Sequence, residues 1–167
     1  MHINFLYMSK TIIRTKTKIL VLLLWTLLAA LSVAAVLWPV YANNINYTFY
    51  FNNILFIIVF IFLIRYLFFI KYTFISGKIA VKILIIVLAI IFDIYAYSAL
   101  NEFIDFYQEN GKYFALEHLP VDKQYDIGDF IFKEYIFFGV AALVSGIIIP
   151  FRLLVSIWHV YNKGREH

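Results

Sequence analysis

Long apolar blocks alternate with short polar segments along the chain. Four of these blocks are almost free of charge, and they cover residues 19–40, 49–70, 79–101 and 134–157. An α-helix rises about 1.5 Å per residue, so about 20 apolar residues cross the roughly 30 Å hydrocarbon core of a bilayer. The pattern predicts an all-α integral membrane protein in which four transmembrane helices pack as a bundle in a single domain.

The positions of the charges predict how this bundle is oriented. All 10 acidic residues except Asp93 and Glu166 lie in residues 102–134, whereas only three of the 14 basic residues lie there. Because basic residues collect in cytoplasmic loops, we expect a multi-pass protein with cytoplasmic N- and C-termini. Its net charge of +4 then reflects sidedness and not nucleic-acid binding. Abundant Ile, Phe, Asn and Tyr favour an AT-rich bacterial source, and therefore a bacterial inner membrane.

The first apolar block permits a second interpretation. A basic segment, an apolar stretch and Val40-Tyr41-Ala42 resemble a secretory signal peptide with its cleavage site. The apolar run is longer than the roughly 7–15 residues of a signal core. We expect the helix to be retained, with cleavage as the alternative.

The extracytoplasmic segment 102–133 is acidic but also rich in aromatic residues, unlike a disordered acidic tail. Asn110-Gly111 and Leu119-Pro120 mark bends. We expect a small, mostly helical acidic cap between the third and fourth helices. Its alternative role is a docking surface for a basic partner or a cationic ligand. The candidate docking residues are Glu102, Asp105, Glu109, Glu117 and Asp122.

Small residues recur at helical spacing in the first and fourth blocks. Such faces allow close packing between membrane helices. The candidate helix-packing residues are Ala30, Ala34, Gly139, Ala142 and Gly146.

Asp93 is the strongest candidate for chemistry, because ionisable residues at membrane depth commonly serve function. Tyr97, one turn outward, is a possible hydrogen-bond donor to it, and Arg65 is a possible counter-ion if the second and third helices are adjacent. Arg65 alternatively snorkels to the interface. Asp93 is expected either to fix helix packing or to relay protons or ions.

Other chemistry finds little support in the residues. The chain has no cysteine, and no histidine lies inside an apolar block, so we expect no metal and no cofactor. His118 has no second ligand nearby, and no phosphate-binding or nucleophile motif occurs.

Three functions therefore remain. The first is a non-catalytic membrane protein that binds another membrane component, as an accessory subunit or a protective protein. The layout is similar to that of immunity proteins against pore-forming bacteriocins, which also place four helices in the membrane with both termini inward. The second is a homo-oligomeric channel or a proton- or cation-coupled transporter that uses Asp93. The third is a lipid-modifying membrane enzyme.

Overall fold

The computed structural model describes the backbone of residues 2–70, 73–75 and 77–163, and the side chains within these ranges from residue 15 to residue 162. The described chain is helical throughout apart from short connections. The elements are α1 (His2–Ala42), α2 (Tyr50–Phe69), α3 (Ile79–Asn110), a short 3₁₀ helix (Phe114–Leu116) and α4 (Val121–Lys163). Each of the four α-helices contains a stretch long and apolar enough to span a membrane, as the sequence predicts.

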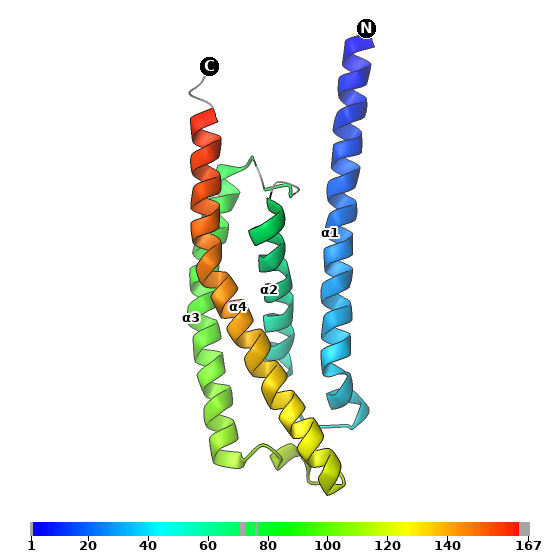
Figure 1. Ribbon diagram of the computed structural model, residues 1–167, viewed down its shortest axis with the longest axis vertical. Coiled ribbons are helices and arrows are strands. Elements are labelled where there is room, and N and C mark those ends of the chain that lie inside the picture. Colours follow the sequence, from blue (N-terminus) through cyan, green and yellow to red (C-terminus); the bar gives the residue numbers. More distant parts are fainter. Residues whose placement is uncertain (1, 71–72, 76, 164–167) are drawn as a thin grey trace.

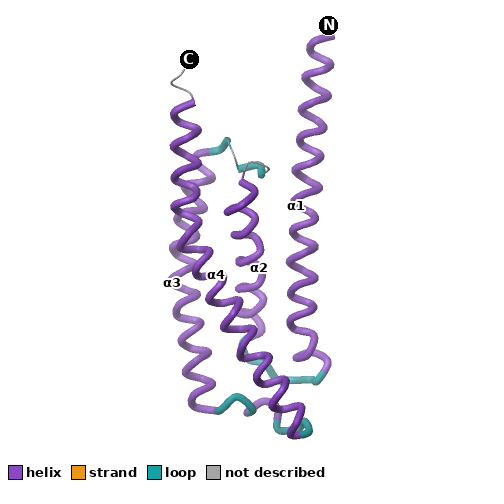
Figure 2. Tube along the Cα trace, in the orientation of Figure 1, coloured by secondary structure: helices purple, strands orange, loops and turns teal. Residues whose placement is uncertain are grey.

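The helices pack as a bundle in which α4 holds the central position. It packs along both α2 and α3, whereas α1 packs mainly on α2 (Figure 1). Only 6% of the most apolar stretch of α1 is buried, against 33% for α2, so α1 is peripheral. The first turns of α1, the α2–α3 connection and the last turns of α4 lie at one end (Figure 2). The other two connections lie at the opposite end, which we call the acidic end because it includes the acidic segment.

Three helices extend beyond the apolar blocks of the sequence. α1 includes residues ahead of position 19, α3 runs past position 101, and α4 begins ahead of position 134. The acidic segment is therefore formed mainly by the ends of α3 and α4, with the 3₁₀ helix between them. α3 stops at Gly111, whose φ of 79° lies in the left-handed region that favours glycine, and its N–H bonds to Tyr107 O at 3.1 Å.

Aromatic residues fix the acidic end of the bundle. Phe103 of α3 stacks on Tyr135 of α4 with ring centroids 3.8 Å apart. Phe49, in the α1–α2 connection, meets both rings edge-on, at 5.1 Å and 5.8 Å. Because all three side chains are buried, this cluster joins the connection to α3 and α4.

The small face of α4 allows α3 to approach closely. A Cβ atom on Gly139 would lie 2.5 Å from Leu100 Cδ2, and one on Gly146 would overlap Asp93 Oδ1. Ala142, between them, is fully buried. The predicted small-residue face of α4 therefore packs within the chain.

Candidate functional site

A buried polar cluster joins α2 to α4 near the acidic end. Asn53 is 0% exposed and Glu134 is 8% exposed. The Asn53 Nδ2 group donates to Glu134 Oε1 and, at 3.3 Å, to the hydroxyl of Tyr47. The two partners of Asn53 come from segments far apart in sequence, so this cluster ties the α1–α2 connection and α4 to α2.

Two oxygen atoms of this cluster have no partner among the described residues, Asn53 Oδ1 and Glu134 Oε2. Both are acceptors when Glu134 is ionised, and an unpaired buried polar atom is costly. A proton on Glu134 Oε2 would turn that atom from an acceptor into a donor, and a carboxylic acid O–H can bond to an amide oxygen. We interpret Glu134 and Asn53 as a neutral acid–amide pair.

Tyr47 adds a hydroxyl to the same cluster from outside the four helices. Burial raises the pKa of the Tyr47 phenol above its ordinary value, so the hydroxyl keeps its proton. Its oxygen can then accept from Asn53 while its own proton is free to be donated. No sequence pattern predicts this cluster, because Asn53 and Glu134 lie near the ends of their apolar blocks and look like boundary residues.

The predicted site around Asp93 is only partly assembled. Asp93 packs against Gly146, and its Oδ1 atom is buried without a hydrogen-bond partner in the described chain. Tyr97 is 64% exposed and makes no hydrogen bond to Asp93. No ion pair joins Arg65 to Asp93 among the described residues, where the ion pairs all involve Asp129.

Arg65 lies inside the protein. Its side chain is 1% exposed, and Nε and Nη1 have no hydrogen-bond partner within the described residues. The guanidinium carbon lies 5.9 Å from the centroid of the Tyr66 ring. Arg65 and Asp93 thus both lie within the bundle, but no ion pair joins them among the described residues.

Two further cations at the end of the bundle near the α2–α3 connection bind backbone carbonyls. Lys82 of α3 is fully buried and donates to Ser156 O at 3.4 Å. Arg152 of α4 donates from Nε to Leu67 O, in the last turn of α2, at 3.1 Å. The contact of Arg152 is favourable because carbonyls at the C-terminal end of a helix lack intrahelical partners and attract positive charge.

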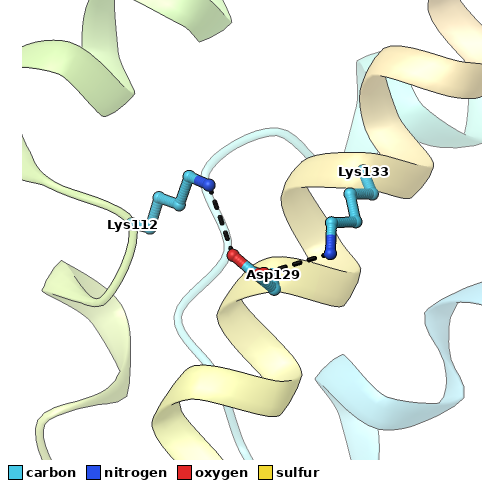
Figure 3. A network of polar contacts seen from close by, with 3 residues as sticks. All are labelled: Lys112, Asp129 and Lys133. Carbon is cyan, nitrogen blue, oxygen red and sulfur yellow. Dashed lines mark hydrogen bonds and ion pairs between the residues drawn. The ribbon is translucent and has the colours of Figure 1, made fainter.

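At the acidic end, Asp129 accepts hydrogen bonds from Lys112 at 3.2 Å and from Lys133 at 3.1 Å (Figure 3). Lys112 follows α3, so the first contact joins α3 to α4. Lys112 Nζ also lies 4.6 Å from the centroid of the Phe132 ring. The candidate docking residues are all exposed: Glu102, Asp105, Glu109, Glu117 and Asp122.

The small face of α1 points away from the bundle. Ala30 and Ala34 are exposed, as is Thr26, whose hydroxyl donates to Leu22 O at 3.0 Å. The neighbouring residue Ala29 is 3% exposed and packs inward. No other helix of the described chain covers the small face, in contrast to the one on α4.

Among the described residues, no three His, Asp or Glu side chains gather closely enough to hold a metal ion. The chain matches no family model, no curated protein and no solved structure.

Proposed function

We propose that this chain is an integral membrane protein of a bacterial inner membrane, crossing it four times with both termini in the cytoplasm. Four apolar helices and the separation of basic from acidic segments support this orientation. The arrangement of the helix ends supports this orientation as well. The acidic segment lies at one end of the bundle, and the first turns of α1 and the last turns of α4 lie at the other end (Figure 1).

The protein acts, in this proposal, without catalysis by binding a transmembrane helix of another membrane protein. The observation that carries it is the contrast between two small-residue faces. The one on α4 is filled by Leu100 and Asp93, whereas the one on α1, at Ala30 and Ala34, is exposed on the helix least buried in the bundle. A small face lets a second helix approach closely, and van der Waals packing drives association where lipid removes the hydrophobic effect.

Site-directed cross-linking tests this proposal, because the chain lacks cysteine and every introduced thiol is unique. Ala30→Cys places a thiol on the small face. Ala35→Cys is the matched control, since it is also exposed but lies about 140° around the helix. Thiol-reactive cross-linking in native membranes should join the Ala30→Cys chain to one partner chain and leave the Ala35→Cys chain free.

Replacement by a larger side chain provides the second test. Ala30→Leu should remove the partner from a gentle detergent purification, and Ala35→Leu should retain it. A cross-link from Ala30→Cys to a second copy of the chain would instead support the homo-oligomeric channel. Equal cross-linking from both positions would contradict a specific helix interface.

A further inference from the structure

A cleft of about 390 Å³ opens at the acidic end of the bundle, next to the buried polar cluster. Its walls come from three segments: the α1–α2 connection, the last turns of α3 and the segment around the 3₁₀ helix. Five of its lining residues are aromatic, and they are Tyr47, Phe49, Phe106, Tyr107 and Phe114. The volume lies within the range of small-molecule sites, which runs from about 300 to 1,000 Å³.

The rings that line the cleft hold one another in place. Phe106 meets Phe49 edge-on at 5.2 Å and Phe114 edge-on at 6.2 Å. Tyr47 and Phe49 are 6% and 5% exposed, so the connection that carries them is anchored in the core. A preformed cleft loses little conformational entropy when a ligand enters.

The charges around the cleft favour a positive ligand. No Lys or Arg is among its lining residues, whereas Glu117 is, and its carboxylate is exposed at the rim. His118 is the lining residue with a basic side chain. Its Nε2 lies 2.9 Å from Asn43 O and donates to it, because a carbonyl only accepts.

The basic residue closest in sequence is already neutralised by other groups. Lys112 is paired with Asp129 and lies over the ring of Phe132. The Lys112 ammonium group therefore contacts both a carboxylate and an aromatic ring at this same end of the molecule.

We propose that the aromatic cleft between the α1–α2 connection, α3 and the 3₁₀ helix binds an organic ammonium ion. Aromatic faces attract cations through their quadrupole, and cages of rings are the common receptors for quaternary ammonium groups. Glu117 supplies a counter-charge at the rim. The ligand is either a free organic cation or the ammonium headgroup of a lipid, since the two share this chemistry. The site is independent of the helix interface on α1.

Choline is the probe, and 3,3-dimethylbutan-1-ol, its uncharged carbon analogue of nearly the same shape, is the matched control. The full chain is placed in nanodiscs of phosphatidylglycerol, which has no ammonium group, and each compound is titrated by NMR. Choline should bind saturably and at least about 5-fold more tightly than the alcohol, because only choline gains from the aromatic faces. Equal binding of both compounds, or no saturable binding of choline, would overturn the proposal.

Two variants locate the binding in the cleft. Phe114→Leu removes one wall ring at a side chain that is 56% exposed, so the fold should tolerate it. Its control is Phe130→Leu, which removes a ring that is 40% exposed and does not line the cleft. Choline affinity should fall about 2- to 5-fold in the first variant and stay unchanged in the second. An equal loss in both would contradict the assignment.

A second lipid identifies the source of the ligand. In phosphatidylcholine nanodiscs, headgroups compete with free choline if the cleft receives lipid, and the apparent choline affinity then falls. An unchanged affinity identifies a free organic cation as the ligand. Glu117→Gln should weaken choline in phosphatidylglycerol nanodiscs and leave the alcohol unaffected, because only the cation interacts with the carboxylate.

Discussion

Replacing Glu134 with leucine should expose how strongly the buried polar cluster holds α4 to α2. The substitution removes the acceptor of the Asn53 Nδ2 hydrogen bond and leaves a fully buried amide with only the Tyr47 hydroxyl as partner. Leaving such a group unsatisfied costs about 1–3 kcal/mol in proteins generally. Interhelical hydrogen bonds in membranes average about 0.6 kcal/mol and reach about 1.7 kcal/mol.

Because Asn53 loses its bond to Glu134 and gains no replacement, we expect Glu134→Leu to lower the free energy of unfolding by about 1–2 kcal/mol. Glu134→Gln has nearly the same shape and carries its own N–H donor for Asn53 Oδ1. It should remain within about 0.5 kcal/mol of the parent chain. The combined change of Asn53 and Glu134 to leucine should cost less than the sum of the two single changes, since no polar group is then left unpaired.

The assay is equilibrium unfolding in mixed micelles, followed by circular dichroism and by the fluorescence of the three tryptophans. A Glu134→Gln variant as unstable as Glu134→Leu would refute the neutral acid–amide pair, because an uncharged amide should serve as well as an uncharged acid. A Glu134→Leu variant as stable as the parent would show that the cluster contributes nothing to the bundle.

Three further changes test other contacts. Gly146→Ala places a methyl group against Asp93 Oδ1 and should cost about 1–3 kcal/mol of unfolding free energy; Asp93→Ala in the same chain should relieve most of it. Asp93→Asn keeps the shape of the side chain, so thermal unfolding should be almost unchanged, whereas proton flux in liposomes should disappear if Asp93 relays protons. Lys112→Met breaks the half-buried contact with Asp129 and should cause a small loss of thermal stability at low salt that vanishes in concentrated salt.

The four helices could be predicted from the sequence, because each apolar block is longer than an ordinary loop and long and apolar enough to form a membrane-spanning helix. The small face of α4 is equally visible, since Gly139 and Gly146 recur at helical spacing and meet α3 closely. A helical wheel identifies such a face, but it does not say whether the covering helix belongs to the same chain. Ala30 and Ala34 illustrate this, because the same pattern on α1 lies exposed.

The polar cluster depends on which helices are neighbours. Asn53 and Glu134 are 81 positions apart, and no local signal links them. The expected pairing of Arg65 with Asp93 required α2 and α3 to be adjacent, whereas α3 packs mainly on α4. Arg65 is also buried, because its position on α2 faces other helices. Side-chain partners across a bundle depend on which helices are neighbours in space, and the apolar pattern does not determine this.

Thiol labelling in intact spheroplasts measures the orientation of the bundle. Glu117→Cys places a thiol at an exposed position of the acidic end, and Lys78→Cys places one at an exposed position between α2 and α3. With a maleimide that does not cross membranes, the Glu117→Cys chain should be labelled in intact spheroplasts and the Lys78→Cys chain only after lysis. Labelling of the Lys78→Cys chain in intact spheroplasts, with protection of the Glu117→Cys chain, would contradict the proposed orientation.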